Sequence, residues 1–245
     1  MSSADEGPQA SLDLTHVLYN DDSLFSLGLA LVTLSPILLM AAYAALAVQT
    51  REFLIIMMWA GQFGCEVLNY VVKHIIKEER PNHSVGTGYA FPSSHSQYMG
   101  YFSAFLICHL YCRHRFSSTG SWILDQAWRM LVYFFISAWA IAVAFSRYYL
   151  KYHSPHQIFW GFGIGVVCGS GLYITTEVVP RRWPNSALGR LKSALISNPI
   201  STWLQIRDGW AIWPDGGREG EWLRWKNEWD KLYGQANTTA TRKMR

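Results

Sequence analysis

The sequence predicts an all-α protein that crosses a membrane several times, and three observations support this prediction. Of its 245 residues, 50% are hydrophobic and only 16% are charged, against roughly 25% charged residues in soluble domains. The apolar residues come in long blocks, and residues 24–48 carry no charge. Such a block exceeds the ~20 residues that a spanning helix needs. A soluble protein with buried core helices is the weaker alternative, because these blocks are too long and too uniform.

Each apolar block is predicted to form one transmembrane helix, which makes about five helices in all. The blocks are residues 24–48, 53–76, 94–111, 128–145 and 158–179. They divide the chain into a leader (1–23), a transmembrane domain (24–179) and a tail (180–245). The leader is acidic and contains no Lys or Arg, unlike the basic start of a signal peptide. We therefore expect the first helix to remain as an uncleaved anchor.

The tail differs from the core because it holds more than half of the chain's 12 tryptophans. Trp222, Trp225 and Trp229 recur on one face of a predicted helix. Tryptophan favours the headgroup zone of a bilayer, so this region is expected to lie on the membrane interface. A small packed cap on the membrane domain is an equally good interpretation. Residues 194–206 are apolar but short and interrupted by Asn198-Pro199, so they are not predicted to span.

The basic residues predict how the chain is oriented. They cluster after the third and the fifth block, at Arg113, Arg115, Arg129, Arg181, Arg182, Arg190 and Lys192. The positive-inside rule places both clusters in the cytosol. The loops at 77–93 and 146–157 then face a lumen. The C-terminal Arg242-Lys243-Met244-Arg245 resembles retrieval signals of endoplasmic-reticulum membrane proteins, so that membrane is the expected location.

A polar stripe crosses the second apolar block. Glu66, Asn69 and Lys73 recur on one helical face. A charge inside the membrane costs about 2.5–3.5 kcal/mol on insertion scales and therefore indicates function. Arg80 follows, roughly 10 Å along the axis from Lys73 if the helix continues. The stripe thus predicts two cations that face a common anion.

A second polar segment, Phe-Pro-Ser-Ser-His-Ser at residues 91–96, precedes the third block. Proline followed by serines is typical of a helix start, and such an end binds anions. We expect Ser93 and Ser94 to contact an anion and His95 to donate a proton. Taken alone, an ordinary helix cap with an interfacial histidine explains the segment better.

A third cluster lies between the last two blocks. Ser146-Arg147 is followed by His153 and Gln157. Arginine binds phosphate in a bidentate way. The Gln157 carbonyl is expected to hold one ring N–H of His153 while the other nitrogen acts as a nucleophile. His156 is a weaker candidate because Gln157 is too near in sequence to orient it.

Together, Lys73-x6-Arg80-Pro81, Pro92-Ser93-x-His95 and Ser146-Arg147-x5-His153 resemble the three-part signature of the type 2 phosphatidic acid phosphatase superfamily. This resemblance implies a helical bundle in which His153 attacks phosphorus and forms a phosphohistidine. It implies that His95 protonates the leaving group and that fixed cations stabilise the phosphate oxygens. No metal or cofactor is then required. Glu66, Asn69 and Ser146 are assigned supporting roles. The phosphate contacts are assigned to Lys73, Arg80, Ser93, Ser94 and Arg147.

Two positions depart from the usual signature. Ser94 replaces a glycine, and Gln157 replaces an aspartate. Both departures resemble the branch of the superfamily that hydrolyses dolichyl diphosphate. So do Thr15-His16-Val17 in the leader, Glu66-x2-Asn69 and Ile206-Arg207-Asp208 in the tail.

The resemblance to this branch implies the reaction and its setting. Dolichyl diphosphate would give dolichyl phosphate and phosphate, which recycles the lipid carrier for protein N-glycosylation. The partners implied are a polyprenyl diphosphate lipid and the bilayer, and no nucleic acid. One alternative is a phosphatase for phosphatidate or a sphingoid phosphate. Another is a non-catalytic lipid-binding membrane protein. A transporter is less favoured because no internal repeat is found.

Overall fold

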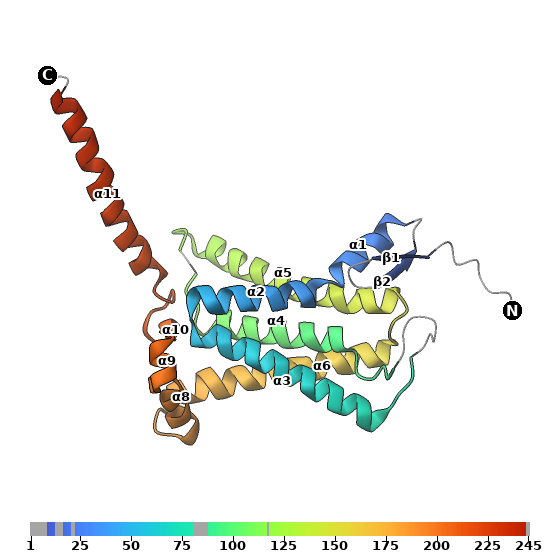
Figure 1. The fold of residues 1–245 in the computed structure, drawn as a ribbon. Helices are drawn as coiled ribbons and strands as arrows, with labels where there is room; N and C mark the ends of the chain where they lie inside the picture. Colours follow the sequence, from blue (N-terminus) through green and yellow to red (C-terminus); the bar gives the residue numbers. More distant parts are fainter. Residues whose placement is uncertain (1–8, 13–16, 21–22, 81–87, 117, 244–245) are drawn as a thin grey trace.

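The structure is a computed structural model that describes residues 9–12, 17–20, 23–80, 88–116 and 118–243. It is almost entirely helical (Figure 1). The helices are α1 (Leu24–Val32), α2 (Ser35–Thr50), α3 (Phe53–Ile76), α4 (Ser94–Cys112), α5 (Trp122–Tyr149), α6 (Pro155–Tyr173), the π-helical turn η2 (Ile174–Val178), α7 (Val179–Arg182), α8 (Ala187–Ser197), α9 (Pro199–Trp203), α10 (Gly209–Ile212) and α11 (Arg218–Lys243).

The leader contributes one small element that the sequence did not predict. Strands β1 (Gln9–Leu12) and β2 (Val17–Asn20) pair antiparallel, with Gln9 opposite Asn20. Thr15 and His16 of the leader motif lie outside the described residues. The prediction for the rest of the chain, a polytopic helical bundle, is confirmed by the helices that follow.

Within the described residues, four helical stretches are long and apolar enough to cross a membrane: Leu24–Thr50, Phe53–Ile76, Trp122–Tyr149 and Pro155–Arg182. The third predicted block forms α4, whose 19 residues also have nearly spanning length, roughly 28 Å. α4 packs against α3, α5 and α6 and lies in the middle of the bundle (Figure 1). Because protein surrounds α4, this helix can carry more polar residues than a lipid-facing one.

α4 and α6 run in the same direction and touch backbone to backbone. A Cβ atom on Gly161 would lie 2.6 Å from the Ser93 carbonyl oxygen, and one on Gly165 would lie 2.1 Å from that of Gln97. Only glycine fits such close approaches, which are typical of small-xxx-small helix pairs in membranes. This packing brings the first turns of α4 and α6 to the same end of the bundle.

The first block forms one candidate span, as predicted, but this span is broken between α1 and α2, which the sequence analysis did not predict. α1 ends at Val32 and α2 begins at Ser35, with Pro36 in its first turn. Between them, the buried Thr33 hydroxyl lies 2.6 Å from the Ser146 hydroxyl of α5. A proline in this position cannot continue the α1 hydrogen bonds, so the chain turns here. α1 packs on α5, whereas α2 packs on α3 and α4.

Part of the tail is packed onto the opposite end of the bundle from the first turns of α4 and α6. Glu52, between α2 and α3, is buried and accepts a hydrogen bond of 2.9 Å from the Gly209 N–H. It also forms an ion pair of 2.8 Å with Arg207. Lys192 of α8 pairs with Glu177 at 2.9 Å and with Asp208 at 2.8 Å. These contacts hold the segment from α8 through α10 against the bundle as a cap. One of the two interpretations of the tail predicted such a cap.

The last helix behaves differently from this cap. α11 extends away from the bundle (Figure 1). Its three tryptophans are half-exposed, and the Trp225 and Trp229 rings lie 5.5 Å apart on one face. The helix and its aromatic face agree with the sequence prediction, and its placement on a membrane interface stays a prediction.

Candidate active site

Three segments that are distant in sequence meet at one end of the bundle (Figure 1). They are the end of α3 with the segment after it, the first turn of α4, and the end of α5 with the loop before α6. The charges of Lys73, Arg80 and Arg147 act on both His95 and His153, which places all five side chains within electrostatic range of one another. The predicted convergence of the three motifs is thus found in the structure, while the role of each residue remains a proposal.

Arg80 reaches this cluster from a loop rather than from a helix. α3 ends at Ile76 because Lys77 adopts a left-handed conformation with φ of 54°. The second block thus ends at residue 76, as predicted, and Lys73 and Arg80 do not lie on one continuous helix. The Arg80 Nε is buried and has no hydrogen-bond partner. Pro81 lies outside the described residues.

Arg147 is the most deeply buried cation of the cluster, with 5% exposure. Its guanidinium carbon lies 3.8 Å from the centroid of the Tyr152 ring, and its Nε has no hydrogen-bond partner. None of the ion pairs among the described residues involves Lys73, Arg80 or Arg147. Buried cations that lack a carboxylate partner are costly unless they bind an anion. Their arrangement is suited to a phosphate group.

One ring nitrogen of His153 is engaged in a hydrogen bond with Gln157. Its Nδ1 lies 3.3 Å from the Gln157 Oε1, and since a carbonyl oxygen only accepts, Nδ1 carries the proton. The other nitrogen, Nε2, then has its lone pair available for attack. Burial, together with the charges of Arg147 and Arg80, lowers the pKa of His153 to about 3. The ring is therefore neutral at physiological pH, as a nucleophile requires.

Glu78, a carboxylate to which the sequence analysis assigned no role, contacts the side chain of Gln157. The Gln157 Nε2 donates to the Glu78 Oε1 at 2.7 Å and to the Glu79 carbonyl oxygen at 3.2 Å. These two bonds fix the orientation of the amide, so that its oxygen faces His153. An aspartate at position 157 would place two carboxylates against each other. The neighbouring Glu78 is thus a physical reason for the Gln157 departure.

One signal in the sequence pointed to Glu78. Glu78-Glu79 is a pair of carboxylates between two cations assigned to phosphate, where negative charge would repel the substrate. That position makes sense only if a carboxylate serves another group, and Gln157 is that group for Glu78. The distance of 79 positions between the two residues hides their contact from any local pattern.

Ser93 is used differently from the prediction. Its backbone N–H donates to the Gln157 carbonyl oxygen at 3.1 Å, so this N–H is not available to a phosphate. Its hydroxyl caps α4 and lies 3.0 Å from the Ser96 hydroxyl, which donates to it. The first turn of α4, at Ser94 and His95, remains the candidate helix end for an anion.

The residues assigned supporting roles join the segments. Asn69 is buried, and its Nδ2 donates to the Pro92 carbonyl oxygen at 3.3 Å and to the Gln97 Oε1 at 2.8 Å. Ser146 donates to the Val143 carbonyl oxygen and contacts the break between α1 and α2. Glu66 is within electrostatic range of Lys73 but forms no direct ion pair with it.

His156, the weaker candidate nucleophile, lies outside the cluster. It is exposed and stacks on Phe91 with ring centroids 5.4 Å apart. His153, in contrast, is buried, with 4% exposure. The structure therefore separates the two histidines that the sequence places three residues apart.

The sequence matches the PAP2 superfamily over residues 53–181. The chain belongs to this superfamily. The matched region runs from α3 to α7 and contains all three motifs. The resemblance drawn from the motifs is thereby confirmed at the level of the family.

Similar proteins include three that are named as dolichyldiphosphatases. Dolichyldiphosphatase 1 of Mus musculus is 33% identical, over 80% of this chain and 80% of that protein. Dolichyldiphosphatase 1 of Dictyostelium discoideum is 34% identical, over 82% and 83%. Dolichyldiphosphatase of Saccharomyces cerevisiae is 32% identical, over 68% and 70%. The predicted branch of the superfamily agrees with these relatives.

One solved structure is similar to this one. The crystal structure of a transmembrane PAP2 type phosphatidylglycerolphosphate phosphatase from Bacillus subtilis matches with a TM-score of 0.48 and 19% identity. The match covers 59% of this chain and 73% of that chain.

Proposed function

We propose that this protein hydrolyses dolichyl diphosphate to dolichyl phosphate and inorganic phosphate. The observation that carries the proposal is a pair of histidines beside three cations at one end of a membrane-spanning bundle. These cations take part in none of the ion pairs among the described residues. The relatives named dolichyldiphosphatase support the choice of lipid, since they are similar over most of the chain. The hydrolysis of a lipid phosphate follows from the family; the dolichyl group is the finer part of the proposal.

The terminal phosphate would be held by Lys73, Arg80 and Arg147. Charge-assisted hydrogen bonds from guanidinium groups to phosphate are short and strong. The first turn of α4 would add a helix N-terminus at Ser94. Because these donors are fixed before the substrate binds, they stabilise charge on the oxygens of the transition state without reorganisation. Fixed cations would here do what a metal ion does in other phosphatases.

The reaction would proceed in two steps. First, the His153 Nε2 attacks the terminal phosphorus, the bond from phosphorus to the bridging oxygen breaks, and His95 gives its proton to that oxygen as dolichyl phosphate leaves. Next, water attacks the phosphohistidine, His95 takes a proton from this water, and the bond from phosphorus to the His153 nitrogen breaks. Phosphate is released and both histidines return to their starting states.

Glu78 and Gln157 would support this sequence as positioning residues. Gln157 keeps the Nδ1–H of His153 in place, so that the attacking nitrogen faces the phosphate. When phosphorus bonds to His153, the ring gains positive charge. The Glu78 carboxylate, linked through the Gln157 amide at 2.7 Å, would offset part of that charge.

The endoplasmic reticulum and a lumenal active site are part of the same proposal. The basic clusters support the lumenal orientation, since the positive-inside rule assigns them to the cytosol and they lie at the end opposite His153. The C-terminal Arg242-Lys243-Met244-Arg245 supports the endoplasmic reticulum. Recycling of the lipid carrier for N-glycosylation would then take place on the lumenal leaflet. The sequon Asn237-Thr238-Thr239 provides a test, since it is expected to stay unglycosylated in cells. A glycan on Asn237 would show that the tail is lumenal and would contradict the proposed orientation.

The substrate can be tested with purified protein in detergent that contains EDTA. Phosphate release is measured from a short-chain polyprenyl diphosphate, the matching monophosphate and phosphatidate. We expect the diphosphate to give the highest kcat/KM and to yield the monophosphate as product. Preference for phosphatidate would instead identify a different lipid phosphatase. No release from any of the three would favour a non-catalytic lipid-binding protein.

A further inference from the structure

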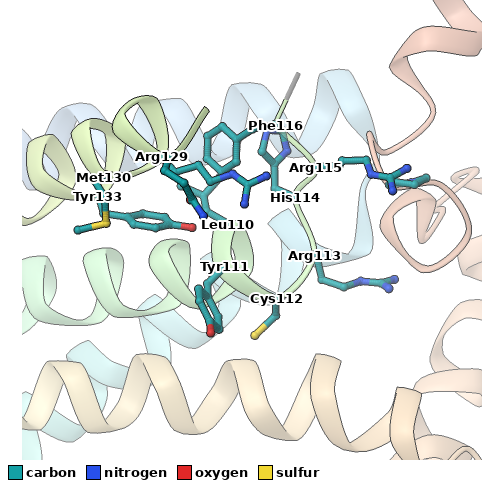
Figure 2. Close-up of a pocket in the computed structure, with 12 residues that line it drawn as sticks. Leu110, Tyr111, Cys112, Arg113, His114, Arg115, Phe116, Arg129, Met130 and Tyr133 are labelled. Carbon is teal, nitrogen blue, oxygen red and sulfur yellow. The ribbon is translucent and has the colours of Figure 1, made fainter. Parts of the chain in front are cut away.

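A second basic hollow lies at the end of the bundle opposite His153. It has a volume of about 440 Å³ and lies where the end of α4, the chain after it and the first turns of α5 meet (Figure 2). Its walls include Arg113, Arg115 and Arg129 together with His114. No Asp or Glu is among the described residues that line it, whereas Asp125, Asp215 and Glu219 line an adjoining hollow that shares Arg115 and Arg129. The proposed catalytic chemistry makes no use of this hollow.

The arginines of this hollow are not equivalent. Arg113 donates to the Trp210 carbonyl oxygen and so is tied to the tail. Arg115 and Arg129, by contrast, take part in none of the ion pairs of the described chain. The Arg129 Nε is buried and has no hydrogen-bond partner. A buried donor of a charged group without an acceptor is costly, and such a group is expected to have a ligand.

Aromatic and apolar side chains complete the hollow around Phe116. The Phe116 ring lies 5.8 Å from the Arg129 guanidinium carbon, 4.7 Å from the His114 ring and 6.4 Å from the Tyr133 ring. Figure 2 shows Arg129 and Tyr133 on α5 and Phe116 on the chain that follows α4. Met130, also in the wall, is 65% exposed. The hollow therefore offers cations beside an apolar wall.

Acidic residues close to the hollow are engaged elsewhere. Asp125 accepts hydrogen bonds from the Ser118 hydroxyl at 2.8 Å and from the Thr119 N–H at 2.7 Å. Asp215 accepts from the N–H groups of Gly217 and Glu219 at 3.0 and 2.6 Å. Asp125 lies within electrostatic range of Arg129, one turn further along α5, but none of the ion pairs among the described residues joins the two. The arginines of the hollow keep their donors for another anion.

We propose that this hollow binds a phosphate group, either in the headgroup of an anionic phospholipid or as free phosphate. Guanidinium donors recognise phosphate through paired hydrogen bonds. Basic hollows between membrane helices at the cytosolic side bind anionic headgroups in this way. The topology rule accounts for the presence of arginines here but not for a buried donor without an acceptor. Met130, in the wall of the hollow, and Phe134, one turn further along α5 toward the bilayer interior, are both exposed and apolar, as acyl chains require.

The test compares Arg129→Gln with Arg182→Gln in the full-length protein in detergent. Arg182 is a matched control because it is exposed, lies at the same end of the bundle and does not line the hollow. Native mass spectrometry measures binding of phosphatidylinositol, an anionic phosphodiester with no terminal phosphate to hydrolyse, and of zwitterionic phosphatidylcholine. The melting temperature with and without inorganic phosphate measures binding of the free ion.

If a lipid headgroup is the ligand, phosphatidylinositol binds about tenfold more weakly to Arg129→Gln than to wild type or Arg182→Gln, while phosphatidylcholine binding is unchanged. If free phosphate is the ligand, the melting temperature of Arg129→Gln alone stops responding to it. Equal behaviour of the two variants toward both probes overturns the proposal. Should Arg129→Gln not fold, the exposed Arg115→Gln replaces it, with the same expected direction.

Discussion

The two ends of the bundle handle buried charge in opposite ways. At the end that carries His153, Lys73, Arg80 and Arg147 lie together, and the described ion pairs include none of them. At the other end, Lys192 pairs with Glu177 and Asp208. Paired charges hold segments of the chain together, whereas unpaired buried cations require an anion from outside. The comparison separates charges that maintain the fold from charges that bind a ligand.

The same comparison also distinguishes the hollow around Arg129 from the cap beside it. Both lie at the end of the bundle opposite His153. Lys192 and Arg207 of the cap pair with carboxylates, whereas none of the ion pairs among the described residues includes an arginine of the hollow. Substitutions in the cluster around His153 should therefore lower catalysis, those in the hollow around Arg129 should weaken ligand binding, and those in the cap should lower stability.

Removal of the proposed nucleophile should have the greatest effect. His153→Ala is expected to lower kcat by about 10³-fold or more, because no other group can form the covalent intermediate. Phosphate release from a polyprenyl diphosphate measures this. His156→Ala is the control, since that ring stacks on Phe91 outside the cluster. Equal loss in both variants, or unchanged release by His153→Ala, would contradict the assignment.

Loss of an unpaired cation should harm catalysis more than stability. Arg147→Gln removes one donor for charge on the transferring phosphate, so kcat/KM is expected to fall about 10²- to 10³-fold. Its melting temperature should change little, because the removed charge was buried without a carboxylate partner. A large fall in melting temperature with kcat/KM near that of wild type would show that Arg147 maintains the fold instead of binding the phosphate.

Loss of a paired cation should do the opposite. Lys192→Gln leaves Glu177 and Asp208 buried without their partner, which is expected to cost about 3 kcal/mol of unfolding free energy. Thermal unfolding in detergent measures this, and the kcat of the folded fraction should stay close to that of wild type. Lys226→Gln, which removes an exposed pair with Asp230, is the control and should cost less than about 0.5 kcal/mol.

A positioning carboxylate should have an intermediate effect on catalysis. Glu78→Gln replaces the acceptor that orients Gln157, so kcat is expected to fall about 10- to 100-fold with KM nearly unchanged. Glu79→Gln is the control, because Gln157 bonds to the backbone carbonyl of Glu79 and not to its side chain. A change in KM alone would indicate that Glu78 acts on substrate binding instead.

The pH dependence provides the smallest and most specific prediction. The pKa of His153 is lowered to about 3 by burial and by Arg147 and Arg80, so the neutral nucleophile persists as pH falls from 7 to 5. Over this range kcat/KM should not fall. A histidine with the ordinary pKa near 6.5 would lose roughly tenfold or more of its neutral form by pH 5. A tenfold decline per unit below pH 6.5 would therefore contradict the burial of His153.

Much of the fold could be predicted because hydropathy is a local property. The apolar blocks predicted where helices lie, and their ends follow proline, serine and left-handed residues. The bend between α1 and α2 was missed, although Pro36 was a signal for it. The central position of α4 was also missed, because glycines of α6 create it: Gly161 and Gly165 let two backbones touch.

The sequence by itself determined the membrane-spanning helices, the family and the residues that could form a phosphate site, since apolar length, residue type and spacing are contained in a linear pattern. Only the tertiary structure decided which of these groups have partners. Glu78 orients Gln157, the Ser93 N–H is taken by a carbonyl, and Arg129 lines a second basic hollow. A hydrogen bond depends on the distance between two atoms, and only the packing of the helices sets that distance.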